Sequence, residues 1–563
     1  MPYLVPALIA ATASAVAPAP GRLAYVIRPG LDGHYSRTRV TLSFTPAGAG
    51  CRLLLPTGWF GGDGVGKAVA GLRAGPAGVR LTDTARPGVK ALTYPPGRAV
   101  AVEYDVVQAP PIAPPGDAAA GRKPYCYHFG EDLLAVPDWD PAAPRSLAVE
   151  WADVPGGWAV CDSYGAGPDR REFRDTLARF RHATFVGGDF RLHRFRAGGR
   201  TITLAVRGRP AFRDADLVAV LRALYEAEGR FWGDDDFLYT LVVLYPTHGP
   251  AGNLGGEGRT NSFSVHLSDR EGLGFGVKHL VAHELFHGWN PGKLHWDGVR
   301  SYWFTEGATD YYAGLMVLRA GLCPLDEYVA SRNAALRGYY LSPARDLPYP
   351  RLMADRDASP DADRQIYARG MLLAADWDAE IRAATGGARS LDDVMRGLAR
   401  AAAGTPPAAL SDAAVAAGLR PYLGGRGAAD IRRFIGAGET IRPRADGLGR
   451  WAALKTVPVP TFDLGFGPGT FARKVVTGVV PGGPAARAGL RDGQVVVAGG
   501  FVPGAADQPV ELRVRDGAGE RTIRYLPAGP AVGVPQYELR PGLSAGERAA
   551  CLKALGAPAD KAR

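Results

Sequence analysis

The segment His283-Glu-Leu-Phe-His287, in the middle of the chain, restricts the fold and chemistry more than any other. On an α-helix two residues four positions apart lie about 40° apart around the axis, so both imidazoles can reach one metal ion. Glu284, between them, is placed to take a proton from a metal-bound water. Apolar residues of the same segment fill the other faces, as in a helix buried beneath an active site. The sequence therefore predicts a zinc-binding helix, and the alternative is an ordinary amphipathic helix.

A third zinc ligand is expected further along the chain. Catalytic zinc takes three protein ligands and keeps one position open for water, so His283 and His287 need a partner. Glu306 follows after enough residues for a loop and a return on a second helix. Asp310, one turn later, faces the same way and could accept the free N–H of His283. Aromatic neighbours indicate that both carboxylates are buried, and burying them unpaired would be costly.

The sequence offers other possible zinc ligands. A third histidine six residues after the second motif histidine would define another class of zinc protease, but that position is Lys293. His295 falls in an expected loop. Asp310 could replace Glu306 as the ligand, but Glu306 would then have no role. No Glu follows His279, one turn before the motif, and it fits a packed or exposed histidine better than a ligand.

The length and composition are typical of a soluble, multidomain protein. Its 563 residues are enough for three or four domains, and 46% hydrophobic with 22% charged residues is normal for globular proteins. The net charge is +10, but the basic residues are scattered among acidic ones, which argues against nucleic-acid binding. After the N-terminus no apolar stretch approaches the roughly 18 residues of a membrane span. We expect no transmembrane segment.

Residues 1–17 are apolar and small, which is typical of a secretory signal peptide. Ala13-Ser14-Ala15 or Ala15-Val16-Ala17 could be the cleavage site, although no Lys or Arg precedes the apolar run. The sequence therefore predicts export to the periplasm or secretion. The alternative is a disordered Ala/Pro-rich terminus on a cytoplasmic protein.

Five widely spaced cysteines form no CxxC pair, which excludes a zinc ribbon and a dense disulfide framework. One bridge between Cys126 and Cys161 would fit an oxidising compartment. Isolated buried thiols fit the spacing equally well.

The N-terminal part, residues 21–210, is rich in β signals. Its short, partly alternating segments are separated by Gly/Pro turns and predict an all-β, sandwich-like domain. A Pro-rich insertion at residues 109–115 is expected to be a loop. The clearest strand candidates are Leu23–Ile27, Arg39–Phe44, Ala99–Tyr104 and Thr201–Val206.

Residues 211–450 change to a mixed and then mostly helical pattern. A helix is expected after the possible cap Asp214, stopping at Gly229. A strand at Phe237–Tyr245, a Gly-rich turn at Gly249–Gly258 and an alternating strand around Val265 then lead into the zinc helix. The later helices are expected at 309–320, 325–338, 364–383 and 390–402, the last with a capping box of Ser390 and Asp393.

Residues 460–540 return to strands and short turns, and residues 541–563 form a C-terminal tail. The segment Val480–Gln494 separates this part from the helical region. No internal repeat has a period typical of solenoids or propellers.

The runs from His283 to Asn290 and from Trp303 to Tyr312, followed by Arg319-Ala-Gly-Leu, resemble the glycyl aminopeptidase family of zinc metallopeptidases, peptidase family M61. The resemblance implies a multidomain α+β protein. It would have an N-terminal β domain at 21–210, a thermolysin-like (gluzincin) catalytic domain with a helical C-terminal lobe at 211–450, and a PDZ-like domain at 460–540. Leu55–Trp59 is similar to a Leu-Pro-x-Trp segment of the β domain with one extra residue, and Pro484–Leu490 is similar to a PDZ segment.

The resemblance adds two site residues. Tyr367, in Tyr-x-Arg-Gly, matches a tyrosine that stabilises the oxyanion, although a core tyrosine would fit the same helix. Glu257 matches the glutamate of a Gly-Gly-Leu-Glu-His strand that holds the substrate's free amine. Here the strand reads Gly255-Gly256-Glu257-Gly258, so it departs from the family on both sides of Glu257. In the PDZ-like part Gln494 stands where Asp is usual, and Asp463–Phe466 is an imperfect carboxylate-binding loop.

The resemblance implies a zinc aminopeptidase acting on peptides with small N-terminal residues, Gly or Ala. One alternative is an endopeptidase that cuts envelope proteins delivered by the PDZ-like domain. Another is a scaffold without activity that binds peptides through that domain. The expected partners are a peptide or protein substrate and a C-terminal peptide at the PDZ-like domain, with no nucleic acid.

Overall fold

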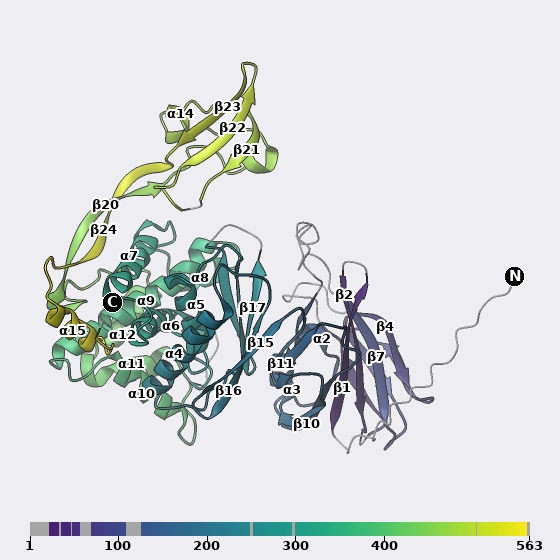
Figure 1. The fold of residues 1–563 in the computed structure, drawn as a ribbon. Helices are drawn as coiled ribbons and strands as arrows, with labels where there is room; N and C mark the ends of the chain where they lie inside the picture. The colour runs from purple at the N-terminus through teal and green to yellow at the C-terminus, as the bar shows by residue number, and fades with distance from the viewer. Residues whose placement is uncertain are drawn as a thin grey trace. The chain divides into compact units, whose positions relative to one another are not determined.

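The computed structural model describes residues 22–32, 35–46, 48–56, 69–107, 125–247, 252–294, 299–502 and 504–559 (Figure 1). The expected signal peptide, the Pro-rich loop at 109–115, Trp59 and His295 lie outside these residues. The chain divides into two compact units, residues 1–288 and 289–563. The expected multidomain α+β class is confirmed in its coarse form, a β-rich N-terminal region and a helical region.

The first unit starts with a six-stranded sheet in the order β13-β10-β1-β2-β7-β4. β1 pairs parallel with β10 and antiparallel with β2. Buried and partly exposed residues alternate over the first half of β7, as expected for a strand with one face on the core. The strands are β1 (Leu23–Asp32), β2 (Tyr35–Phe44), β4 (Val69–Gly75), β7 (Val100–Val107), β10 (Arg145–Trp151) and β13 (Arg171–Asp175).

Two four-stranded sheets, β5-β6-β3-β9 and β12-β11-β14-β8, complete the β-rich region. Buried side chains from all three sheets share one hydrophobic core, among them Leu42, Leu92 and Phe185. The elements are β3 (Gly50–Leu54), β5 (Arg80–Asp83), β6 (Val89–Thr93), β8 (Cys126–Phe129), α2 (Gly130–Leu133), β9 (Val136–Pro137), β11 (Ala159–Asp162), β12 (Gly165–Ala166), α3 (Leu177–Arg181) and β14 (Thr184–Gly188).

A five-stranded sheet, β15-β16-β17-β19-β18, carries the elements beside the zinc motif. Its central strand β17 pairs parallel with β16 and β19, and its first four residues are fully buried, as in parallel sheets covered on both faces. β18 is an edge strand, antiparallel to β19. The domain boundary expected near residue 210 falls between β16 and β17, which pair with each other in this sheet. The strands are β15 (Arg191–Ala197), β16 (Arg200–Val206), β17 (Leu241–Thr247), β18 (Leu254–Arg259) and β19 (Ser262–Ser268).

Several element limits differ from the sequence prediction in this unit. Helix α4 (Asp214–Trp232) has Arg213 as its N-cap and continues through Gly229. It ends at Gly233, which has a left-handed backbone (φ 65°). Gly229 remains helical because its small size suits a close contact with Phe237: a Cβ there would lie 3.1 Å from that ring.

The glycine-rich segment before β19 is a strand over part of its length. Leu254–Arg259 form β18. The Gly-rich pattern predicted a turn there, whereas the resemblance to the M61 family implied a strand. Pairing with β19 supplies the hydrogen bonds that hold these glycines extended. The preceding strand, β17, starts at Leu241 rather than Phe237.

The second unit contains the expected helical region. The helices predicted at 325–338, 364–383 and 390–402 are confirmed, and so is the Ser390–Asp393 capping box. The helix that carries Glu306 starts earlier than expected, at Tyr302. The helices are α6 (Tyr302–Arg319), α7 (Leu325–Leu341), α8 (Tyr349–Asp355), α9 (Pro360–Ala384), α10 (Leu391–Ala402), α11 (Asp412–Leu423) and α12 (Arg426–Asp430), followed by a π-helical turn at Ile431–Gly436.

Helices α6 and α9 pack with their backbones in close contact. A Cβ at Gly370 would lie 2.8 Å from the Cα of Gly307 and would collide with the carbonyl oxygen of Trp303. Only glycine therefore allows this approach, which sets α6 against α9 directly beside Glu306.

We expect Gly370→Ala to lower the free energy of unfolding by about 1–3 kcal/mol, because the added methyl meets backbone atoms that cannot rotate away. Urea unfolding of the purified protein measures this. Gly338→Ala on α7 is the matched control, because a Cβ there meets nothing within 4 Å. Equal stability of the two variants would contradict the close packing.

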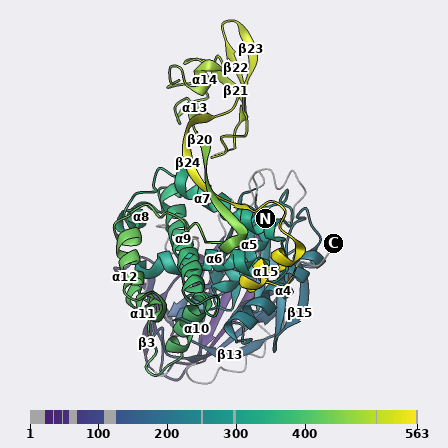
Figure 2. The ribbon, with the colours of Figure 1, turned by 90° about the vertical axis from the view of Figure 1, so that its left-hand side faces the viewer.

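A two-stranded ribbon, β20 (Ala452–Phe462) with β24 (Ala528–Leu539), leads from the helices to a small β module (Figure 2). The side-chain amide of Asn333 on α7 binds the backbone N–H and C=O of Tyr537 at 2.7 and 2.8 Å, which fixes the base of the ribbon. The module has its own hydrophobic core. Its elements, with the C-terminal helix, are α13 (Thr470–Arg473), α14 (Pro484–Arg487), β21 (Val495–Gly500), β22 (Val510–Asp516), β23 (Gly519–Tyr525) and α15 (Ala545–Ala554).

All five cysteines are free thiols, so the bridge considered between Cys126 and Cys161 is not formed. Burial raises the pKa of the Cys126 thiol to about 12, which keeps it protonated and unreactive. Among the described residues, no helix combines the length and apolar character that a membrane crossing requires.

Candidate metal centre

Helix α5 (Phe275–Phe286) carries the zinc motif, and its last six residues, from Val281 to Phe286, are all buried. His283 and Glu284 are only 6% and 5% exposed. His287 follows as the helix C-cap and keeps a helical backbone, so it still lies one turn above His283. The two Nε2 atoms lie 3.0 Å apart and the two rings are perpendicular. Both imidazoles therefore direct the same nitrogen toward one point.

The carboxylate of Glu284 lies against the edge strand β18. A Cβ at Gly256 would collide with the Cγ and carboxylate of Glu284, so any larger residue there would force the Glu284 side chain to shift.

We expect Gly256→Ala to lower kcat by on the order of 10²-fold, because displacing a catalytic group by about 1 Å has effects of that size. Zinc content should not change, since no candidate ligand is touched. Gly276→Ala in the first turn of α5 is the control, because a Cβ there meets nothing within 4 Å. Unchanged kcat in Gly256→Ala would show that Glu284 does not act from this position.

Helix α6 supplies Glu306, which is 8% exposed, and the half-buried Asp310 one turn later. The start of this helix is tied to the residues after the zinc helix. The buried side-chain amide of Asn290 donates to Thr309 Oγ1 at 3.1 Å and to the carbonyl of Thr305 at 3.4 Å. These bonds lock the helix rotation that determines where Glu306 points.

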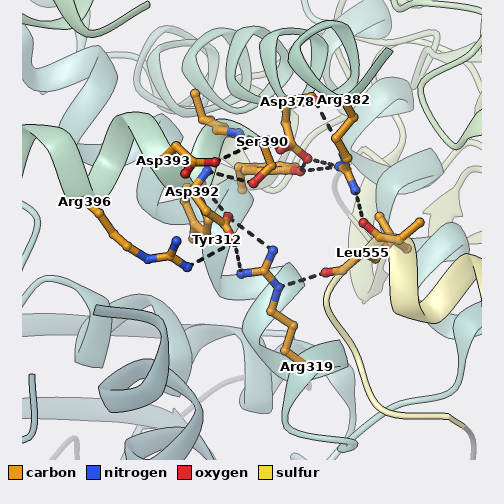
Figure 3. Close-up of polar contacts among 12 residues, drawn as sticks. Tyr312, Arg319, Asp378, Arg382, Ser390, Asp392, Asp393, Arg396 and Leu555 are labelled. Atoms are coloured by element: carbon orange, nitrogen blue, oxygen red, sulfur yellow. Dashed lines mark hydrogen bonds and ion pairs between the residues drawn. The ribbon is translucent and has the colours of Figure 1, made fainter. Parts of the chain in front are cut away.

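The residues directly after Asp310 anchor α6 in a buried polar network (Figure 3). The Tyr312 hydroxyl donates to Asp392 at 3.0 Å, and Arg319 forms an ion pair with the same carboxylate at 2.9 Å. Arg319 Nε also donates to the carbonyl of Leu555, just after α15, at 2.9 Å. Tyr311 donates to Asp378 on α9. The helix that carries Glu306 is therefore held by α9, α10 and the C-terminal segment.

Tyr367 on α9 is largely buried in the same unit, and its hydroxyl lies 3.1 Å from the hydroxyl of Tyr302. Burial raises the pKa of Tyr367 far above its usual value, and the negative charge of Glu306 and the neighbouring Tyr302 add to the shift. The phenol therefore stays protonated and keeps its O–H as a hydrogen-bond donor.

His283, His287 and Glu306 form a group in which one potential ligand atom of each lies within 4.8 Å of the others. Within the described ranges, this is the one group of three or more His, Cys, Asp or Glu side chains with that property. His279 and Asp310 do not belong to it. Two imidazoles and one carboxylate are a donor set of catalytic zinc sites, so these residues fit a Zn²⁺ ion.

Glu257, the expected amine-binding residue, is engaged in an ion pair. Arg259, two residues along β18, donates to Glu257 and also to Glu131 at 3.1 Å. Burial raises the pKa of Glu257, and the charge of Arg259 opposes that shift. The sequence pattern predicted a role for Glu257 but gave no sign of its partner Arg259.

Glu228 on α4 was missed by the sequence analysis. Its side chain is fully buried, and neither carboxylate oxygen has a hydrogen-bond partner among the described residues. Burial raises its pKa well above the usual value, and a smaller electrostatic effect of His283 opposes the shift, which places Glu228 near that imidazole. The sequence did contain a sign of this residue, because Glu228 falls on the same helix face as the apolar residues Leu221 and Leu224.

A cavity of about 1290 Å³ lies in the second unit beside Tyr367 and Asp310. Its walls come from α7, α9, residues 458–462 of β20 and the module segment around Ala506. Ligand pockets typically measure about 300–1,000 Å³, so the volume is ample for a short peptide.

Residues 277–373, which include both histidines, Glu306 and Tyr367, match the M61 glycyl aminopeptidase family. The resemblance expected from the sequence is thereby confirmed over this segment.

Comparison with solved structures shows the fold over nearly the whole chain. An aminopeptidase N family protein from Idiomarina loihiensis has 18% identity and a TM-score of 0.69, covering 95% of this chain and 100% of that one. An M1 zinc metallopeptidase from Deinococcus radiodurans has 15% identity and a TM-score of 0.42, covering 75% of this chain and 95% of that one. Comparison with curated proteins gives no match.

Proposed function

We propose that the protein hydrolyses peptide bonds with one zinc ion held by His283, His287 and Glu306. The observation that carries the proposal is the convergence of these three donors within 4.8 Å, inside the segment that matches the M61 family. When bound, zinc lowers the pKa of water toward about 7 and polarises the scissile carbonyl.

Glu284 is the proposed general base. It takes a proton from the attacking water and passes it to the leaving amine, a role that requires a carboxylate close to the ion but outside its ligand set. Its burial on α5 and its contact with β18 support this role, because both restrict where the carboxylate can point.

Tyr367 is the proposed donor to the oxyanion of the tetrahedral intermediate. Its protonated hydroxyl supports this role, because a neutral phenol can donate a hydrogen bond to an oxyanion. Tyr302 orients the hydroxyl from 3.1 Å away. We further propose that Asp310 orients His283 by accepting its second ring N–H.

The proposed substrates are peptides with a small N-terminal residue, Gly or Ala, with Glu257 contacting the substrate amine. The ion pair between Glu257 and Arg259 favours a second candidate, an endopeptidase, because a neutralised carboxylate holds an ammonium weakly. A scaffold without activity would leave the buried, converging donors unused.

We propose that residues 460–540 are a PDZ-like module that binds C-terminal peptides. Gln494, in place of the usual Asp, is buried and donates to Asp516 at 2.7 Å while accepting from the backbone of Arg491 at 2.9 Å. It thus acts as a structural residue of the module. We also propose that the protein is exported, with residues 1–17 as its signal peptide.

Removal of zinc tests the proposed function. We expect the chelator-treated protein to lose hydrolysis of Gly- and Ala-initiated peptides, and one equivalent of zinc to restore it. The assay uses each peptide with a free and an acetylated amine. Cleavage of only the free form supports an aminopeptidase, and cleavage of both supports an endopeptidase. If the zinc-loaded protein cleaves neither form, the result supports a peptide-binding scaffold without activity.

A further inference from the structure

Arg259 sits at the centre of a small ion cluster on the first unit. Glu257 and Arg259 lie two residues apart on β18 and therefore share one face of the strand. The guanidinium donates through one nitrogen to Glu257 and through another to Glu131 on α2, at 3.1 Å for the latter. It thereby bridges two carboxylates that are far apart in the sequence.

The guanidinium of Arg259 is held firmly in this position. Its side chain is 9% exposed, and its central carbon lies 3.5 Å from the centre of the Phe129 ring. A cation packed on an aromatic face and screened from water gains more from each contact than a surface ion pair does. A competing ammonium would have to displace it or share carboxylates that are already neutralised.

The cluster also contains more carboxyl groups than cations. Asp132, next to Glu131, is 5% exposed, and no side chain among the described residues donates to its carboxylate. Burial raises the pKa of Asp132 to about 7, and the charge of Glu131 adds to the shift. Without Arg259, the same space would strongly favour another cation.

Glu257 is one strand position away from the contact with the candidate base Glu284. It directly follows Gly256, where an added Cβ would meet the carboxylate of Glu284. Because successive side chains of a strand point to opposite faces, Glu257 and Arg259 lie on the other face of β18. β18 is a sheet edge, so a substrate chain that lies along this edge could reach both groups.

We propose that Arg259 decides whether the enzyme requires a free substrate amine, because its guanidinium already makes the contact with Glu257 that a substrate ammonium would make. With Arg259 present, peptides with free and blocked amines are accepted about equally, and the endopeptidase candidate is favoured. The inference rests on the proposed function in assigning Glu257 to the amine end of the substrate.

Equilibrium binding tests the inference without turnover. The zinc-loaded Glu284→Gln protein is titrated calorimetrically with Ala-Ala-Phe and with N-acetyl-Ala-Ala-Phe, and the ratio of the two Kd values is compared between variants. We expect a ratio within about twofold of one in this background. Adding Arg259→Met should raise the preference for the free amine by about tenfold, the effect of one charge-assisted hydrogen bond.

Three further variants separate the role of the charge from that of the fold. Arg259→Lys keeps a cation and should keep the ratio near one. Arg259→Met combined with Glu257→Gln should lose the gained preference, because the freed carboxylate is gone. Arg200→Met on β16 removes an ion pair with Asp236 in the same sheet and should change nothing. Zinc content and thermal unfolding confirm that each variant is folded.

Two results would overturn the inference. One is an unchanged ratio, or no peptide binding, in folded Arg259→Met. The other is a strong free-amine preference with Arg259 present that Glu257→Gln abolishes. If Arg259→Met does not fold, Glu257→Gln alone decides, and it should leave the ratio unchanged. Absence of hydrolysis by the wild-type protein would contradict the proposed function but not this binding result.

Discussion

Glu284→Gln is expected to keep its zinc and to lower kcat for peptide hydrolysis by about 10³-fold, within the range for loss of a general base. The amide has the shape of the carboxylate but cannot accept the proton of the attacking water. The ligands His283, His287 and Glu306 are untouched, so metal binding should persist. Steady-state kinetics and metal analysis of the same preparation measure both effects.

A matched control for this variant is Glu226→Gln on the surface of α4, where the side chain is 52% exposed. It removes the same charge from the protein without entering the site, and we expect unchanged kcat. Turnover by Glu284→Gln equal to that of this control would exclude Glu284 as the base. Loss of zinc from Glu284→Gln would instead indicate that the carboxylate belongs to the ligand set.

Glu306→Ala is expected to lose both zinc and hydrolysis. The variant leaves two imidazoles, which are too few for a catalytic zinc site. Asp310→Asn should have a smaller effect, about 10- to 100-fold in zinc affinity, as is typical when a group behind a ligand is changed. Competition with a chromophoric chelator measures the affinity of each variant.

The variants of Glu306 and Asp310 show which of these two carboxylates is the third zinc ligand. If Asp310 were the third ligand, Asp310→Asn would lose zinc while Glu306→Ala would keep most of it. Glu327→Gln, which changes a first-turn carboxylate of the neighbouring helix α7, is the control and should bind zinc as the wild type does.

The parts of the site that are local in the sequence could be predicted from it. Helix periodicity alone places His283 and His287 on one side of α5, and the same reasoning places Asp310 one turn after Glu306. The chain-wide order of β-rich and helical regions also follows from local patterns. These features need no knowledge of what packs against them.

Element limits were harder to predict where packing overrides local preference. Helix α6 begins at Tyr302 because its buried aromatic residues and Gly307 fit against α9, although such residues favour helices only weakly. Gly229 stays inside α4 for a similar reason, its contact with Phe237. In both cases a tertiary contact decides the conformation.

The residues that modify the site could not be predicted because their partners are distant in sequence. Arg259 meets Glu131 across 128 positions, and nothing near Glu257 signals that contact. The anchoring of α6 through Arg319 to the carbonyl of Leu555 spans 236 positions. Pairings of this kind become visible only once the sheets and helices are assembled.

An anomalous difference map from crystals of the zinc-loaded protein tests whether one zinc ion is bound by His283, His287 and Glu306. We predict a single strong peak with Nε2 of both histidines at about 2.0–2.1 Å and a Glu306 carboxylate oxygen at about 2.0–2.2 Å. A peak coordinated by Asp310 or His279 in place of Glu306, or no peak at these residues, would contradict this set of zinc ligands.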